Sequence, residues 1–266
     1  MRTRIITAIV ALAIFVPFVV YGGIPLTILI SLLGVIAVGE LLFMKKRLLV
    51  SFEALVSFVA VVVTILPNSF WRLLPAPTFL NPRTLIYLFI FLLLLTTVLS
   101  NNKLSFDDAG ALSLGVLYIG FGFHFFLQAR AENWMAFVFG LIIVWLTDSF
   151  AYIIGRKLGR HKLIPKISPN KTWEGSIGGT AVATIVAIIF AESTHFATHF
   201  SLFEIALATL ILSIAGQFGD LIESALKRYF GVKDSGTLLP GHGGILDRFD
   251  SMLIVMPIIV LIGLTA

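Results

Sequence analysis

The feature that most constrains this chain is a series of long apolar runs separated by short polar segments. A bilayer core about 30 Å thick requires roughly 20 mostly apolar residues in each spanning helix. Only 12% of the residues are charged, about half of the fraction that is usual in soluble globular proteins. The sequence therefore predicts an all-α polytopic membrane protein with about nine transmembrane helices. The apolar runs lie near 5–21, 24–43, 50–66, 84–99, 109–128, 134–155, 175–191, 202–229 and 250–265.

Basic residues are divided unequally between the two sides that nine spans would define. Of the 19 Lys and Arg residues, 16 fall on the side of the amino terminus, and only Arg72, Arg83 and Arg130 fall on the other. Cytoplasmic loops carry an excess of Lys and Arg, so we expect a cytoplasmic amino terminus and an outside carboxyl terminus. The expected location is the cell inner (cytoplasmic) membrane. The net positive charge of the chain then mainly reflects its orientation in the membrane. No nucleic-acid partner is expected.

Ionisable residues at membrane depth are concentrated in the second half of the chain. Residues 1–130 contain almost none and are expected to form a scaffold of about five helices. Residues 131–266 are expected to form the functional region, with about four helices and cytoplasmic loops at 156–174 and 230–249. Ionisable residues inside spans are costly and usually mark a functional site. Asp148 lies about seven residues before the charged end of its run, roughly 10 Å deep, and Asp220 lies at a similar depth.

Polar residues recur at three- and four-residue steps along the run 202–229. This spacing places them on one face of a helix. Polar residues in membranes often make hydrogen bonds between helices, but an unpaired carboxylate is a costly way to pack them. We therefore expect this polar stripe to face a functional site. It consists of Ser213, Gly216, Gln217, Asp220, Glu223, Ser224 and Lys227, and the run before it carries a shorter stripe at Asp148, Ser149, Tyr152 and Arg156.

The loop that follows combines glycine with charge. Glycine-rich turns that lead into a helix let backbone N–H groups approach an anion closely. Asp247 and Asp250 follow the loop and share one helical face. Like charges this close raise each other's pKa unless a cation intervenes, and oxygen ligands beside phosphates favour Mg²⁺. The loop therefore predicts a metal and phosphate site. Its glycines include Gly236, Gly241, Gly243 and Gly244, and its basic residues are Lys233, His242 and Arg248.

A second basic segment precedes the run 175–191. It reads Ser168-Pro-Asn-Lys-Thr-Trp-Glu-Gly175 and is followed by Gly178 and Gly179. A lysine before a glycine-rich helix start is suited to a phosphate or pyrophosphate. Lys171 is therefore a candidate phosphate ligand, whereas Lys162 and Lys166 are interpreted as solvated loop residues.

These residues resemble the signature of the phosphatidate cytidylyltransferases, also called CDP-diacylglycerol synthases. The first element is Ser224-Ala-Leu-Lys227-Arg228, followed after four residues by Lys233-Asp234-Ser-Gly-Thr-Leu-Leu-Pro240-Gly-His242-Gly243-Gly244-Ile-Leu-Asp247-Arg248-Phe-Asp250-Ser251. The segment at 168–175 resembles a second element, except at Asn170, which receives no role. The resemblance covers 148–251 by motif and the rest by length and hydropathy. It implies transfer of CMP from CTP to phosphatidic acid in phospholipid biosynthesis, giving CDP-diacylglycerol and pyrophosphate.

The resemblance also implies a divalent metal, Mg²⁺ or Mn²⁺, with K⁺ as a candidate companion ion. Phosphatidate is already ionised, so the carboxylates are assigned to metal rather than to proton transfer. The assigned metal ligands are Asp148, Asp220, Glu223, Asp247 and Asp250. The residues expected to act on the substrate phosphates are Lys227, Arg228, Lys233, His242 and Arg248. The remaining substrate-binding candidates are Ser168, Lys171, Thr172, Ser224, Asp234, Gly241, Gly243 and Gly244.

An ion-coupled membrane transporter is the main alternative, because intramembrane carboxylates also mark ion pathways. It predicts charges toward both faces and two related halves, whereas the acids here lie toward one side and no repeat is found. CDP-alcohol phosphotransferases place acids four residues apart, but Asp247 and Asp250 are three apart. Gly115, Gly120 and Gly122 would permit close helix contact within or between subunits, so a homodimer is also considered.

Overall fold

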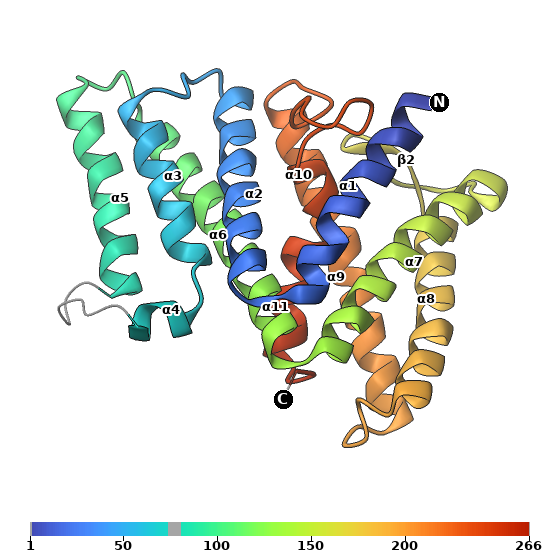
Figure 1. Cartoon of the computed structure of the whole chain (residues 1–266). Helices are drawn as coiled ribbons and strands as arrows, with labels where there is room; N and C mark the ends of the chain where they lie inside the picture. Colours follow the sequence, from blue (N-terminus) through green and yellow to red (C-terminus); the bar gives the residue numbers. More distant parts are fainter. Residues whose placement is uncertain (1, 74–80, 266) are drawn as a thin grey trace. The chain divides into compact units, whose positions relative to one another are not determined.

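Helices make up nearly all of the structure, a computed structural model that describes residues 2–73 and 81–265, with side chains from Ile6 onward (Figure 1). The side chains of Arg2 and Arg4 lie outside the described ones. Contacts divide the chain into two compact units. Unit 1 comprises Met1–Leu127 and Asp234–Leu246, and unit 2 comprises Gln128–Lys233 and Asp247–Ala266. The glycine-rich loop, Asp234–Leu246, therefore packs with the N-terminal helices.

Unit 1 is built from consecutive antiparallel helices, in which α2 packs on α1 and α3, and α3 packs on α5 (Figure 1). Side-chain caps fix two helix starts, since Ser51 accepts from the N–H of Ala54 and Asn81 accepts from that of Thr84. The helices are α1 (Arg2–Tyr21), α2 (Gly23–Met44), α3 (Phe52–Ile65), α4 (Asn68–Leu73), α5 (Pro82–Leu99) and α6 (Phe106–Glu132), of which α6 continues into unit 2. Gly115 and Gly120 lie against Leu41 and Thr64 of the same unit.

Unit 2 is a bundle in which α9 contacts α7, α8 and α11, and α7 packs along α8 (Figure 1). Ser201 and Glu204 form a capping box that starts α9. The elements are α7 (Trp134–Leu158), β1 (Lys162–Ile164), β2 (Ser168–Thr172), α8 (Trp173–Thr194), α9 (Leu202–Tyr229), α10 (Leu246–Phe249) and α11 (Met252–Leu261), and α10 begins at the last residue of unit 1.

Small residues allow α7 and α8 to approach closely. Gly175, Gly179, Ala183, Ala187 and Ala191 follow one another every fourth residue on α8, and all are buried. This spacing forms a single face on which helix backbones in membranes can pack tightly. The glycines after Lys171 therefore serve helix packing here, although the sequence suggested a phosphate-binding helix start.

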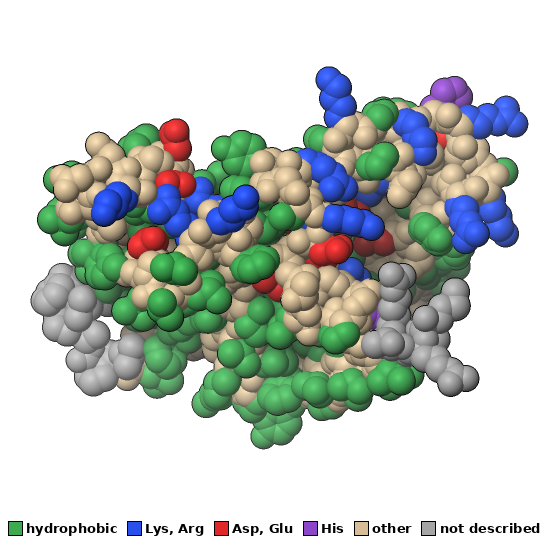
Figure 2. Space-filling model, turned by 90° about the horizontal axis from the view of Figure 1, so that it is seen from above, with side chains coloured by type: hydrophobic (Ala, Val, Ile, Leu, Met, Phe, Trp, Pro, Cys, Tyr) green, Lys and Arg blue, Asp and Glu red, His purple; other side chains and the backbone are tan. Residues whose placement is uncertain are grey.

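The prediction of a helical membrane protein is confirmed. All nine apolar runs form helices, and six described helices are long and apolar enough to span a bilayer, while Ile6–Tyr21, Phe52–Ile65 and Met252–Leu261 are shorter. Large apolar side chains such as Ile24, Leu114, Ile185 and Phe203 point outward, as expected for helices surrounded by lipid. Figure 2 shows a face on which Lys and Arg side chains are exposed beside hydrophobic ones.

One departure from an all-α chain lies in the loop expected at 156–174. There, α7 continues to Leu158, and β1 pairs with β2 as a short antiparallel hairpin, with Lys162 opposite Thr172. Pro165 and Pro169 disfavour a helix in this segment, and the pairing satisfies part of its backbone polar groups. The count of nine spans and their orientation stay predictions.

We expect Gly179→Ala to lower the free energy of unfolding by about 1–3 kcal/mol, because overpacking displaces neighbouring atoms. A Cβ at Gly179 would lie 2.6 Å from the carbonyl oxygen of Thr147 and 2.8 Å from the backbone nitrogen of Ala151. Gly110→Ala is the matched control, since a Cβ there would meet nothing within 4 Å. Thermal unfolding in detergent measures both variants, and equal stability of the two would contradict the packing.

Candidate functional site

The polar stripe of α9 faces its neighbours α7 and α8 in unit 2. At the N-terminal end of the stripe, the hydroxyl of Ser213 lies 2.9 Å from that of Thr147 and 2.8 Å from that of Thr180. The amide of Gln217 accepts from Ser176 at 2.5 Å and donates to Thr180 at 3.0 Å. These polar residues therefore join three helices by hydrogen bonds, which is the packing role that the sequence left open for the stripe.

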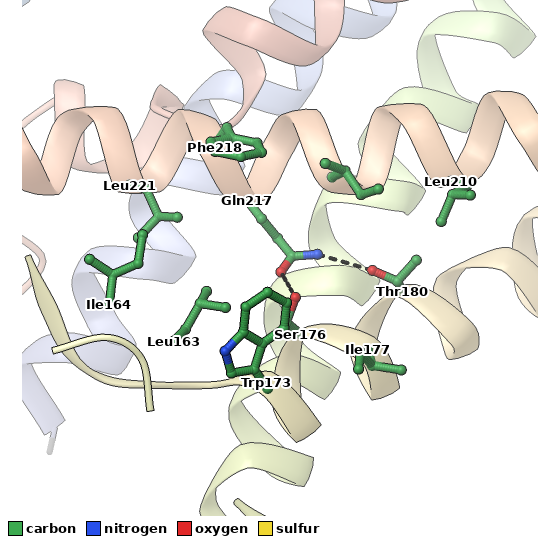
Figure 3. A pocket seen from close by; sticks show the side chains of 11 residues that line it. Leu163, Ile164, Trp173, Ser176, Ile177, Thr180, Leu210, Gln217, Phe218 and Leu221 are labelled. Atoms are coloured by element: carbon green, nitrogen blue, oxygen red, sulfur yellow. Dashed lines mark hydrogen bonds between the residues drawn. The ribbon is translucent and has the colours of Figure 1, made fainter. Parts of the chain in front are cut away.

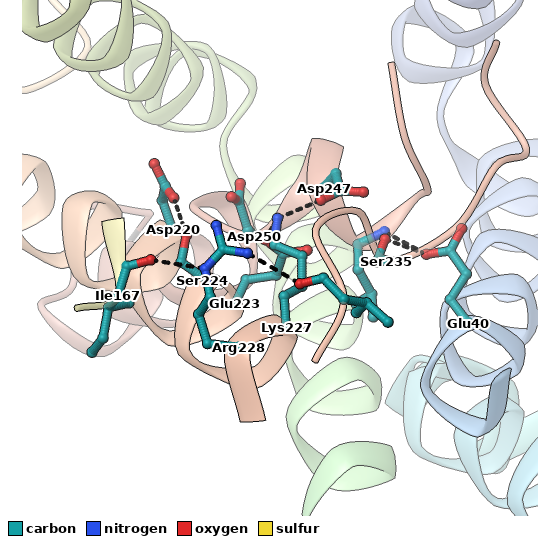
Figure 4. Close-up of polar contacts among 12 residues, drawn as sticks. Glu40, Ile167, Asp220, Glu223, Ser224, Lys227, Arg228, Ser235, Asp247 and Asp250 are labelled. Atoms are coloured by element: carbon teal, nitrogen blue, oxygen red, sulfur yellow. Dashed lines mark hydrogen bonds and ion pairs between the residues drawn. The ribbon is translucent and has the colours of Figure 1, made fainter. Parts of the chain in front are cut away.

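Asp220, one turn further along α9, lies among both positive and negative groups. Its Oδ2 forms an ion pair with Lys171 Nζ at 2.6 Å, and its Oδ1 accepts from the Ser224 hydroxyl at 3.2 Å. The carboxylates of Asp148 and Asp250 are close enough to interact electrostatically with it. Unit 2 therefore brings together three acids and a lysine, which come from α7, β2, α9 and the segment after α10. Figure 4 shows two of these acids, Asp220 and Asp250.

Lys227 joins two further acids. Its ammonium lies 2.5 Å from Glu223 Oε2, one helical turn away, and 2.5 Å from Asp247 Oδ1 (Figure 4). The three side chains are 13%, 2% and 7% exposed, respectively. Because water is nearly excluded, each charge depends on the others for stabilisation. Lys227 therefore pairs with both carboxylates. Its assignment to a substrate phosphate stays a prediction.

Two other predicted site residues of unit 2, Thr172 and Arg228, have local structural partners. Thr172 is buried and caps α8 by accepting from the N–H of Gly175 at 3.2 Å. Arg228 donates to the carbonyl oxygens of Ile167 at 3.3 Å and Val232 at 3.1 Å, so it ties the β-hairpin to the end of α9. Ser168 begins β2, and the side chains of Lys233 and Arg248 are exposed.

The donor set of unit 2 suits a hard divalent cation. Asp148, Asp220 and Asp250 supply carboxylate oxygens within this unit. Within the described ranges, no three His, Asp or Glu side chains form a ready-made metal cluster. Mg²⁺ is commonly held by one or two carboxylates, water and substrate phosphates, so this arrangement fits an ion that arrives with a phosphate-bearing ligand.

The glycine-rich loop in unit 1 has its own set of partners. The backbone of Leu239 pairs with that of Gly243, and the N–H of His242 donates to the Leu239 carbonyl oxygen at 2.8 Å. Gly241 and Gly243 have φ of 77° and 80°, a region that glycine adopts easily. Asp234 begins the loop and Gly244 is buried within it.

Sequence reasoning missed Glu40, which holds this loop from α2. Its carboxylate accepts hydrogen bonds from the loop residues Ser235, Ile245 and Leu246. The signal was present, because Glu40 is an ionisable residue inside the apolar run 24–43 and such residues are functional candidates. Its run belongs to the part of the chain interpreted as scaffold.

An apolar cavity of about 440 Å³ lies between α8, α9 and the β-hairpin of unit 2 (Figure 3). The hydrogen-bonded side chains of Ser176, Gln217 and Thr180 form its polar part. Leu221, the neighbour of Asp220 in the chain, also lines it. The other lining residues are Leu163, Ile164, Trp173, Ile177, Leu210, Ile214 and Phe218.

Comparison with known proteins gives matches over almost the whole chain. The sequence model described as the cytidylyltransferase family matches residues 2–265. The phosphatidate cytidylyltransferase of Staphylococcus haemolyticus (strain JCSC1435) is 45% identical over 259 residues, which cover 97% of each chain. Proteins with the same description from Staphylococcus epidermidis (strain RP62A) and Staphylococcus aureus (strain COL) are 43% and 44% identical, with the same coverage.

We expect Lys227→Met to lower the free energy of unfolding by about 3–5 kcal/mol, because it leaves two buried carboxylates without their counter-charge. Glu223→Gln is the matched variant and should cost less, since the pair between Lys227 and Asp247 remains. Thermal unfolding of the purified protein in detergent ranks the two variants. A larger loss of stability in Glu223→Gln than in Lys227→Met would contradict the bridging role of Lys227.

Proposed function

The chain belongs to the cytidylyltransferase family and forms CDP-diacylglycerol and pyrophosphate from CTP and phosphatidate, and we propose that Asp220 and its neighbours in unit 2 are the reaction site. Identity of 43–45% to phosphatidate cytidylyltransferases over 97% of the chain carries the assignment of the activity. The ion pair between Lys171 and Asp220, beside Asp148 and Asp250, supports the proposed site.

The reaction requires positioning and charge neutralisation more than proton transfer. A phosphate oxygen of phosphatidate attacks the α-phosphorus of CTP in line. The bond from this phosphorus to the oxygen bridging to the β-phosphate breaks, and pyrophosphate leaves with the electron pair. A phosphomonoester carries roughly 1.5 to 2 negative charges at neutral pH, so no strong general base is needed. The protein has to hold two polyanions together.

Basic residues supply part of that neutralisation. We assign Lys171, Arg228, Lys233 and Arg248 to the phosphates of the two substrates. The loop residues Gly241, His242 and Gly243 are assigned to the pyrophosphate or cytidine portion of CTP. Lys227 keeps Glu223 and Asp247 in place through its two ion pairs.

A divalent metal, Mg²⁺ or Mn²⁺, would be held by Asp220 and Asp247, with Asp148 and Asp250 as further ligands or as partners of its water molecules. When bound, it would neutralise phosphate charge and polarise the phosphoryl oxygens. Glu223 is retained as a candidate near this group, and K⁺ remains a candidate companion ion. Lys171 would share Asp220 with the metal, because its ammonium already lies on one oxygen of that carboxylate.

We propose that the site opens to the cytoplasm. CTP is a charged, water-soluble nucleotide, whereas the acyl chains of phosphatidate keep it in the membrane. The last turns of α7 and α9 both carry basic pairs, Arg156–Lys157 and Lys227–Arg228, as expected for helix ends on the cytoplasmic side. This orientation brings each substrate to the site from the phase in which it dissolves.

We expect Asp220→Asn and Asp247→Asn to reduce turnover by about 100-fold or more, because removing a metal ligand forfeits several kcal/mol of charge stabilisation. The measurement uses purified protein in micelles with phosphatidate, labelled CTP and a Mg²⁺ titration. It scores label that becomes lipid-extractable. A chelator should abolish transfer by the wild-type protein, and Asp107→Asn, at an exposed acid of unit 1, is the control.

Near-normal turnover of either variant across the titration would contradict the metal assignment. Absence of label transfer by the wild-type protein with every divalent metal would contradict the activity itself. The first outcome tests the proposed metal ligands, and the second tests the activity itself.

We further propose that the apolar cavity of unit 2 receives one acyl chain of phosphatidate. It is lined mainly by Leu, Ile, Trp and Phe side chains. Leu221 of this lining follows Asp220 directly in the chain, and Trp173 follows Lys171 by two residues. A lipid with its phosphate at Lys171 and Asp220 would therefore find an apolar surface beside its headgroup.

We expect Ile177→Trp to raise the KM for phosphatidate by about tenfold, since changes of pocket size are worth about 1–3 kcal/mol, and to leave the KM for CTP unchanged. Ile177 lines the cavity and is 65% exposed. Ile185→Trp is the matched control, because Ile185 lies on the same helix, is 61% exposed and is not part of the lining. Equal effects of the two substitutions would argue against an acyl-chain site.

A further inference from the structure

The glycine-rich loop Asp234–Leu246 is closed at its base by one carboxylate from α2. Glu40 lies near the end of this helix and is only 7% exposed. Its Oε1 accepts from the N–H of Ile245 at 2.7 Å, and its Oε2 accepts from the N–H of Leu246 at 3.0 Å. Oε2 also accepts from the hydroxyl of Ser235 at 3.0 Å (Figure 4). Glu40 therefore holds the second residue of the loop, Ser235, together with its last two residues, and all four residues belong to unit 1.

Two glycines of the loop make room for this carboxylate. A Cβ at Gly236 would lie 2.8 Å from Glu40 Oε1, and a Cβ at Gly244 would meet both the Glu40 carboxylate and the Ser235 hydroxyl. The sequence predicted that the backbone N–H groups of this loop bind an anion. Two of them, at Ile245 and Leu246, bind an anion that the chain itself supplies.

The hydrogen bonds of Glu40 lie near the two ends of the loop. The residues between Ser235 and Ile245 include Gly241, His242 and Gly243, which are joined locally through the backbone of Leu239. Asp247, which pairs with Lys227, is the residue after Leu246 in the chain. By holding Ser235, Ile245 and Leu246, Glu40 therefore limits the conformations of the loop that contains His242. It also limits the path of the chain from Leu246 into Asp247.

We propose that Glu40 is a positioning residue for the transfer reaction, which acts by holding the glycine-rich loop in one conformation. It touches neither substrate and is not a catalytic residue. Hydrogen bonds to a charged acceptor are shorter and stronger than neutral ones, so a carboxylate suits an anchor that must hold three donors. The inference rests on the proposed role of this loop in binding CTP.

The test is Glu40→Gln in the full-length protein in micelles. The carboxamide keeps the size of the side chain, but its NH₂ group cannot accept, so at least one loop donor loses its partner. We expect kcat/KM for CTP to fall about tenfold or more, with the KM for phosphatidate unchanged. Hydrogen exchange of the peptide covering residues 244–247 should become faster, with the transition temperature close to that of the wild type.

Two further variants separate positioning from general stability. Asp108→Asn makes the same change of charge in unit 1, where Asp108 pairs with Lys45 at 2.9 Å and with Arg47, outside the loop. It should leave both kcat/KM for CTP and the loop exchange unchanged. Ser235→Ala removes one donor to Glu40 and should give a smaller effect of the same kind. In the Glu40→Gln background, Ser235→Ala should lower kcat/KM for CTP by a smaller factor than it does in the wild-type protein, because both substitutions act on one contact.

Activity of Glu40→Gln within about twofold of the wild type, or a loss that Asp108→Asn reproduces, would overturn the inference. A rise in kcat/KM for CTP would overturn it as well, because the carboxylate would then compete with a substrate phosphate for the loop. The exchange measurement does not depend on turnover. Unchanged exchange at 244–247 in Glu40→Gln would therefore refute the anchor even if the proposed function were wrong.

Discussion

The burial of carboxylates among apolar helices is the constraint on which both units depend. An ion taken out of water costs several kcal/mol unless a partner compensates for it. Glu223 and Asp247 are nearly inaccessible and share Lys227, Asp220 has Lys171 and Ser224, and Glu40 is surrounded by donors from the glycine-rich loop. Each of these carboxylates therefore has a partner within the chain that compensates for its lost hydration.

Much of the helical framework could be predicted from sequence because its signals are local. Apolar runs of sufficient length become helices in a bilayer, and three- and four-residue spacing placed the polar residues of α9 on one buried face. Interhelical hydrogen bonds were the alternative to a functional site that the sequence left open for this stripe, and Ser213 and Gln217 make such bonds. The family resemblance, carried by residues 224–251, agrees with the matches over the whole chain.

The missed features depend on contacts that local patterns do not encode. Glu40 and Leu246 are 206 positions apart, and nothing in the run 24–43 reveals which loop its carboxylate would meet. Gly175 and Gly179 looked like a phosphate-binding helix start, but their role depends on the approach of α7. Thr172 stays a predicted substrate ligand, and the sequence did not reveal that its hydroxyl also caps α8. In each case a residue that is suited to an external ligand has a partner within the chain.

In the proposed site, Asp220 helps to hold a divalent cation that binds together with CTP. Electron paramagnetic resonance of Mn²⁺ tests this most directly, because it reports free ion independently of turnover. With purified protein and a non-hydrolysable CTP analogue, we expect Mn²⁺ to bind to the wild-type protein and to bind at least about tenfold more weakly to Asp220→Asn. Equal Mn²⁺ affinity of the two proteins in the presence of the analogue would contradict the claim.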